Sequence, residues 1–120
     1  MNNYISPGAT RTWTNGTGVD KVSGQVVVVG NQIGICTVDI ANGASGEVAF
    51  EGRFNVPKLT TAVILHGEMV LWDASAANFD DNLGTPASGD VSNAAIACTD
   101  AGNGVTTIDI QLANRFGVKA

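Results

Sequence analysis

The stretch GEVAFEGRFNVPK, residues 46–58, decides the fold, because its apolar and polar residues alternate as they do in a half-buried β-strand. The alternation is interrupted at Gly52 and stops at Pro57. A glycine inside a strand permits a bulge or a close backbone approach, and a proline cannot continue the hydrogen-bonded ladder. We therefore predict a strand that bends at Gly52, so that its two halves serve two layers of a barrel or a sandwich.

The rest of the chain has the same extended character. No segment keeps the i, i+3, i+4 spacing of an amphipathic helix over three turns, and β-branched residues and glycines occur throughout. Apolar runs bounded by Gly, Asn, Asp and Pro predict strands near residues 10–14, 19–22, 25–30, 33–39, 46–56, 68–73, 94–99 and 105–113. We expect an all-β fold, a small β-barrel or β-sandwich with an extended N-terminal arm.

Length and charge limit the organisation and the partners. A chain of 120 residues fits one domain, which we assign to residues 1–120. The net charge is −5, and only six residues are Lys or Arg. Nucleic acids and anionic membranes are bound mainly through Lys and Arg, so neither is an expected partner. No apolar run approaches the roughly 18 residues of a membrane span, and the N-terminus lacks the pattern of a signal peptide.

Two segments are predicted to lie outside the core. Residues 1–7 are too few and too polar to form a core, so we expect an extended arm there. Residues 78–93 are polar and contain glycine and proline, which is typical of a long surface loop.

One short pattern recurs along the chain. Gly24, Gly46 and Gly67 are each followed by Gln or Glu and then by an apolar alternation, in SGQVVVVG, SGEVAFEG and HGEMVLWD. Each glycine is expected to form a turn that leads into a strand, so that successive strands enter the sheet from the same end. A chance similarity in a chain rich in glycine and valine is the alternative.

The sequence contains no recognisable catalytic, cofactor or metal-binding cluster. His66 has no second histidine or cysteine at a ligand spacing, and the carboxylates of 80–90 do not follow the EF-hand pattern. We interpret Asp80, Asp81 and Asp90 as parts of a solvated acidic loop. Glycoside chemistry needs two acids across a cleft, and the candidates are better explained as a solvated strand face; they are Glu47, Glu51 and Glu68. We expect no enzyme activity and no cofactor.

The cysteines and tryptophans are interpreted as structural. Cys36 and Cys98 lie in apolar, strand-like contexts, so we expect buried reduced thiols, with a long-range disulfide as the open alternative. Trp13 and Trp72 are expected to anchor the core or an interface, and they are the only residues that could line a ligand pocket.

Four segments together resemble the small bacteriophage capsid cement, or head decoration, proteins. In chain order they are MNNYISPG, VSGQVVVVGNQIGI, SGEVAFEGRFNVPK and HGEMVLWD. Each motif is weak alone, and the resemblance depends on their order and spacing over nearly the whole chain. The chain departs from the family pattern at Arg53, where an apolar residue is usual, and at Leu71, where tyrosine is common.

The resemblance implies a structural virion protein, made in the cytoplasm of the bacterial host and placed on the outer surface of the capsid. Its implied partner is the major capsid protein, whose neighbouring subunits it would join and so stabilise the shell. The implied oligomer is a homotrimer, with a dimer as the alternative. The other functions considered are a module of a tail or fibre and a carbohydrate- or ligand-binding β module.

Two groups of residues are predicted to make these contacts. In the N-terminal arm, Asn3, Tyr4 and Ile5 are expected to touch the capsid, because Tyr4 and Ile5 are apolar in a polar segment. Arg53 and Phe54 are expected at a subunit interface. The alternative for Phe54 is a place in a bulged strand that lies wholly inside one monomer.

Overall fold

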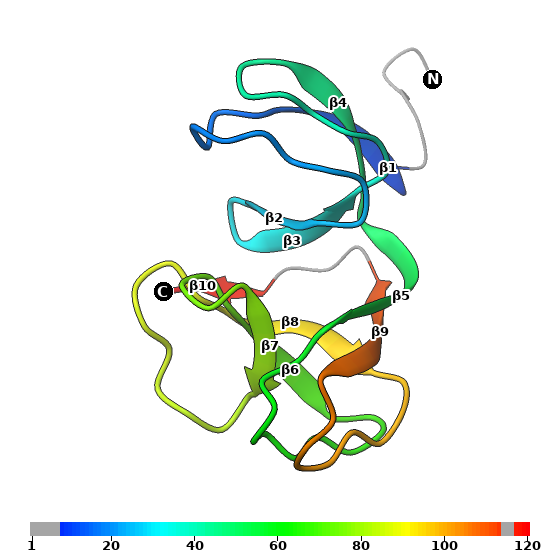
Figure 1. The fold of residues 1–120 in the computed structure, drawn as a ribbon, viewed down its shortest axis with the longest axis vertical. Helices are drawn as coiled ribbons and strands as arrows, with labels where there is room; N and C mark the ends of the chain where they lie inside the picture. The colour runs from blue at the N-terminus through cyan, green and yellow to red at the C-terminus, as the bar shows by residue number, and fades with distance from the viewer. Residues whose placement is uncertain (1–7, 114–116) are drawn as a thin grey trace, which may run out of the picture.

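The computed structural model describes residues 8–113 and 117–120 of the chain. Within these residues it contains strands and no helix, and so no helix that could cross a membrane. The strands, shown in Figure 1, are β1 (Thr10–Thr14), β2 (Val26–Val29), β3 (Gln32–Cys36), β4 (Ser45–Ala49), β5 (Glu51–Pro57), β6 (Met69–Asp73), β7 (Asn78–Asp81), β8 (Val91–Ala97), β9 (Thr107–Ala113) and β10 (Val118–Lys119). The expected all-β fold is confirmed.

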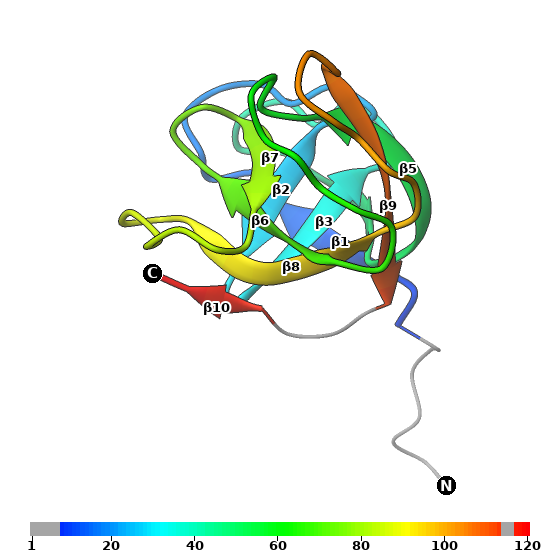
Figure 2. The same ribbon diagram turned by 90° about the horizontal axis from the view of Figure 1, so that it is seen from below.

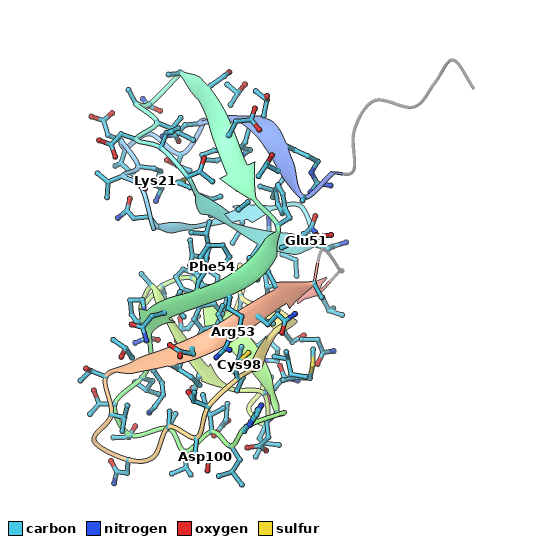
Figure 3. The ribbon with its side chains drawn as sticks, turned by 90° about the vertical axis from the view of Figure 1, so that its right-hand side faces the viewer. Lys21, Glu51, Arg53, Phe54, Cys98 and Asp100 are labelled. Carbon is cyan, nitrogen blue, oxygen red and sulfur yellow. The ribbon has the colours of Figure 1, made fainter. Side chains whose placement is uncertain are left out.

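The predicted division of this stretch between two layers is confirmed, but the strand breaks at Phe50, and Gly52 lies inside β5 in regular register with Leu112. β4 belongs to one sheet and β5 to the other, although only Phe50 separates them along the chain. Gly52 has a φ of +116°, a backbone conformation that residues with a Cβ rarely adopt. Figure 3 shows the chain passing from the upper half of the molecule to the lower half beside Glu51. Residues 46–58 thus contribute a strand to each layer.

The first sheet is covered on both faces at β2 and β3, whereas β1 is mostly exposed. Its antiparallel strands have the order β1-β4-β3-β2. The main core is the larger apolar cluster, to which β3 contributes Ile33 and Ile35 and the second sheet contributes Val70, Phe79 and Ile110 among others. Every residue of β3 is buried, because Ile33 and Ile35 pack into this core while Cys36 packs on the opposite face. That opposite face carries a second, smaller core formed by Val27, Cys36, Ile40, Val48 and Phe50. The β2–β3 hairpin therefore lies between two apolar layers.

The second sheet closes the main core from the other side. Its order is β5-β9-β8-β6-β7, and β10 runs beside β8, as Figure 2 shows. β9 alternates in burial, so that Ile108, Ile110 and Leu112 point into the core. The rings of Trp72 and Phe79 pack 5.0 Å apart in the same core. The two sheets form a sandwich-like fold and not a closed barrel.

The recurring glycine pattern corresponds in part to a recurring turn. In residues 22–25 and 65–68, the N–H of the fourth residue donates to the carbonyl of the first, and the third residue is a glycine with φ near +90°. The side chain of the fourth residue reaches back and accepts from the first N–H: Gln25 from Val22 at 2.9 Å, and Glu68 from Leu65 at 2.6 Å. Each turn is thus closed twice, once by backbone and once by a side chain.

Residues 87–90 form a third turn of this kind, which the sequence pattern did not include. Asp90 accepts from the N–H of Ala87 at 3.0 Å, and Gly89 has a φ of +92°. The second occurrence of the sequence pattern forms no such turn, because Gly46 lies inside β4. The expectation that these strands enter one sheet is wrong for β6, which belongs to the second sheet.

Each of the three turns is also docked on a neighbouring segment. The N–H of the turn glycine donates to the backbone carbonyl of one residue in that segment, the docking residue. The N–H of the docking residue donates in return to the carbonyl of the fourth turn residue. The docking residues are Cys36, Ala97 and Ala120. Since β2, β6 and β8 begin directly after these turns, the turns fix where three strands enter the sandwich.

Several sequence expectations need correction. Residues 78–93 are not one long loop: they contain β7 and the start of β8, because Phe79 and Val91 are fully buried in the main core. Only residues 82–90 connect the two strands. Residues 19–22 form no strand but a single bridge between Lys21 and Ile40. β10 was not predicted, because two exposed residues give no alternation to detect.

The two cysteines differ in environment. Cys36 is buried and free, as expected, and this burial raises the pKa of its thiol, an effect that the positive charge of Lys21 partly offsets. Cys98 is also free but only half-buried, because β8 ends at Ala97 and the chain turns outward there. The expectation of burial is therefore wrong for Cys98, and no disulfide joins the pair.

Candidate interaction surfaces

The structure places only part of the predicted contact residues. Asn3, Tyr4 and Ile5 lie outside the described residues. Arg53 projects from β5, exposes 61% of its side chain and pairs with Asp109 of the neighbouring strand at 3.8 Å (Figure 3). Phe54 is half-buried against the main core. Their place at a subunit interface stays a prediction.

The acidic residues that the sequence analysis interpreted as solvated have different local roles in the structure. Asp90 is buried, with 4% of its surface exposed, and its carboxylate accepts from the N–H groups of Ala74 and Ala87. The interpretation of Asp90 as a solvated loop acid is therefore wrong, because this carboxylate ties two segments together. Glu47 and Glu51 lie in different sheets and so do not share a strand face. Among the described residues, no cluster of His, Cys, Asp or Glu could hold a metal ion.

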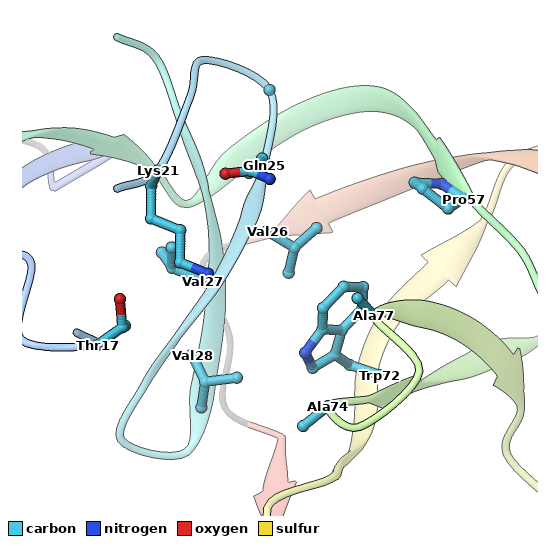
Figure 4. A pocket seen from close by; sticks show the side chains of 11 residues that line it. Thr17, Lys21, Gln25, Val26, Val27, Val28, Pro57, Trp72, Ala74 and Ala77 are labelled. Atoms are coloured by element: carbon cyan, nitrogen blue, oxygen red, sulfur yellow. The ribbon is translucent and has the colours of Figure 1, made fainter. Parts of the chain in front are cut away.

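A groove opens between the first sheet and the turn that joins β6 to β7, and we call it the inter-sheet groove (Figure 4). It has a volume of about 360 Å³, within the range of roughly 300–1,000 Å³ that is usual for binding sites. On one side lie Val26 and Val28 of β2, and on the other lie Trp72, Ala74 and Ala77. These residues make the groove largely apolar.

Lys21 gives the inter-sheet groove its charge. It is the only charged residue among those that line the groove, where Thr17 and Gln25 are the other polar side chains. The one ion pair in the described part of the chain joins Arg53 to Asp109, so the Lys21 ammonium has no carboxylate partner there. The groove is therefore lined by apolar side chains and one positive charge.

A second hollow, of about 210 Å³, lies at the other end of the β6–β7 hairpin, away from its turn. It is lined by Ile64, Glu68, Met69, Asp81, Asn82 and Leu83. At its rim Leu83 exposes 86% of its surface, more than any other large apolar residue in the described chain. The side chain of Asn82 holds this segment by bonding both the N–H and the side-chain carbonyl oxygen of Asn93.

These surfaces were only partly predictable from the sequence. Trp72 was named as a residue that could line a pocket, and it does line the inter-sheet groove, but with only 6% of its surface exposed. Lys21 and Leu83 were not singled out. The available signal was the contrast of each with its neighbours: a cation in an acidic protein, and a leucine in a polar segment. That Lys21 lies beside the valines of β2 in this groove can be seen only in the folded structure.

Comparison with known proteins assigns the family. Residues 5–112 match the family model of the phage cement proteins. The match covers most of the chain, so this protein belongs to the phage cement protein family. A comparison with curated proteins finds no match. The resemblance found in the sequence is thereby confirmed, and a cement protein family implies a structural phage protein of the virion capsid.

Proposed function

We propose that this protein binds the outer surface of a phage head and cements neighbouring major capsid subunits, without catalytic activity. The observation that carries the proposal is the family match over residues 5–112. In this role the protein acts as a homo-oligomer, with three copies as the expected number. The fold supports the role, since its strands enter the sandwich through doubly closed turns and present a pre-formed surface.

Multiplicity explains how a small acidic domain can act as a cement. Once one copy of an oligomer is bound, the next contact is intramolecular, and avidity can exceed a single affinity by about 10²–10⁴-fold. Each copy therefore needs only a modest contact. In this proposal that contact is made by the N-terminal arm through Asn3, Tyr4 and Ile5, while Arg53 and the exposed part of Phe54 face a neighbouring subunit.

Binding to heads that lack the protein tests the proposal directly. Purified protein is added to such heads, unbound protein is removed by sedimentation, and the heads are imaged by cryo-electron microscopy. The expected result is added density on the outer surface, repeated at equivalent positions between capsid subunits. Density only on a tail or fibre of intact virions, or no binding to heads at a large excess, contradicts the proposal.

A further inference from the structure

Leu83 is an apolar side chain that its own chain leaves uncovered. It exposes 86% of its surface, yet the segment that carries it is fixed. Its N–H donates to the Asp81 carboxylate at 3.3 Å, and Asn82 is held by two hydrogen bonds to Asn93. A side chain that is already positioned loses little conformational freedom on binding, which favours its use as an anchor in an interface.

The inter-sheet groove could supply the apolar cover that Leu83 lacks within its own chain. Its walls are aliphatic and aromatic, and its single charge, Lys21, has no carboxylate partner in the described chain. The segment beside Leu83 is acidic, with Asp80 and Asp81 immediately before Asn82. Leu83 follows β7 in a turn, and its N–H bond to the Asp81 carboxylate keeps these two residues side by side. A leucine and the carboxylate two residues before it can therefore meet an apolar wall and a neighbouring cation together.

We propose that copies of this chain join by inserting Leu83 of one copy into the inter-sheet groove of the next, with Asp81 paired to Lys21. Within one copy the two surfaces are separate, because the residues that line the groove and those that line the hollow beside Leu83 have no member in common. This proposal rests on the self-association that is part of the proposed function, and it identifies the two surfaces that would form the contact.

The proposed contact is heterologous, because different surfaces meet. Repetition of a heterologous contact produces a ring when the rotation closes, and three copies would complete the expected ring. A sugar is a poorer occupant of the groove, because Trp72 exposes only 6% of its surface and offers little ring face for stacking. A segment of the capsid protein is the remaining competitor, and the experiment separates it from a second copy.

The test is the association of the purified full chain, measured by sedimentation equilibrium over a wide range of concentrations. Leu83→Ser removes the anchor at an exposed position, and Leu65→Ser is the matched control, since Leu65 is also an exposed leucine, at 54%. We expect Leu83→Ser to weaken association at least about tenfold, the effect of leaving one leucine in water. Leu65→Ser should leave it unchanged, and both variants should keep the wild-type circular-dichroism spectrum.

Charge exchange tests the pairing. Lys21→Glu places like charges together and should weaken association several-fold, by a factor that shrinks as salt is added. Combining Lys21→Glu with Asp81→Lys restores opposite charges and should recover part of the association, since Asp81→Lys also removes the hydrogen bond to the Leu83 N–H. Equal weakening by Leu83→Ser and Leu65→Ser, no recovery in the double variant, or a wild type that is monomeric up to about 1 mM each overturns the proposal.

Head binding distinguishes this inference from the proposed function. If Lys21→Glu abolishes binding to heads but leaves self-association intact, the groove faces the capsid, and the contact between copies is wrong while the cement role stands. If the variants dissociate the oligomer as expected but the wild type never binds heads, the contact stands and the cement role fails.

Discussion

Gly34 shows at the level of one residue how tightly the smaller core packs against the first sheet. It lies in the middle of β3, and a Cβ built there would lie 2.4 Å from Val48 Cγ1 and 2.8 Å from the Phe50 ring. Both neighbours belong to the smaller core and are almost fully buried, so neither can move without disturbing the packing. The position therefore requires glycine for space and not for backbone conformation.

We accordingly predict that Gly34→Ala destabilises the protein by about 1–3 kcal/mol, the usual cost of overpacking a core. Urea unfolding measures the change. Gly16→Ala is the control, because nothing lies within 4 Å of a Cβ at that position, and its free energy of unfolding should stay within about 0.5 kcal/mol of wild type. Similar losses in both variants would show that β3 is not confined as described.

Asp73 gives a prediction about pH. Hydrogen bonds from the N–H of Ala76 and the side chain and N–H of Ser75 stabilise its carboxylate and hold its pKa below the ordinary value of 3.8. The charged form is thus favoured by folding, so this contribution is complete above pH 3.8 and is lost as pH falls through the lowered folded value.

An NMR titration of the Asp73 carboxyl group in the folded protein should give a midpoint below 3.8. Ser75→Ala removes the side-chain hydrogen bond and should raise that midpoint. Because the group is close to solvent, the effect on overall stability should be small. A midpoint at or above the ordinary value, or one that Ser75→Ala does not move, contradicts this account.

At the level of elements, the turn at 87–90 differs from the turns at 22–25 and 65–68 in its burial. Asp90 is 4% exposed and accepts from two N–H groups, one in its own turn and one at Ala74. Gln25 is exposed and accepts one N–H within its turn. A hydrogen bond to a charged group contributes about 1.5–3 kcal/mol and a neutral one about 0.5–1.5 kcal/mol, and Asp90 accepts two part-buried bonds where Gln25 accepts one exposed bond.

We therefore expect Asp90→Ala to lower the free energy of unfolding by about 2–4 kcal/mol and Gln25→Ala by less than about 1 kcal/mol. Thermal unfolding of the two variants at one pH and concentration gives the comparison. If Gln25→Ala proves as costly as Asp90→Ala, burial is not what separates the two turns.

The elements that were predictable from sequence are those in which apolar residues repeat. The 46–58 stretch revealed two strands in two layers, because Gly52 interrupts an otherwise regular alternation, but the crossing itself lies two residues earlier, at Phe50. β7 was missed because Phe79 is its only apolar residue, and a single residue has no period. The inter-sheet groove could not be predicted, since its residues come from stretches around 17–28, 57 and 72–77 that meet only in the fold.

For the whole molecule, the way in which the N-terminal segment joins the sandwich decides whether capsid binding and folding can be separated. The carbonyl of Ala9 accepts the N–H of Phe50 at 2.8 Å, directly beside the point where the chain crosses between sheets. Removal of residues 1–7 keeps this bond, whereas removal of residues 1–9 loses it. The two truncations differ by two residues and form a matched pair.

If Asn3, Tyr4 and Ile5 contact the capsid, deletion of residues 1–7 should weaken head binding about tenfold or more, since an oligomer loses one contact per copy. Its melting temperature should remain within about 2 °C of wild type, because the cut lies before the Ala9 bond. Deletion of residues 1–9 should lower the melting temperature further, with no larger loss of binding per folded molecule. Co-sedimentation with heads and calorimetry measure the two quantities. A 1–7 deletion that melts several degrees lower yet binds heads as well as wild type would assign this segment to the fold and remove it from the capsid contact.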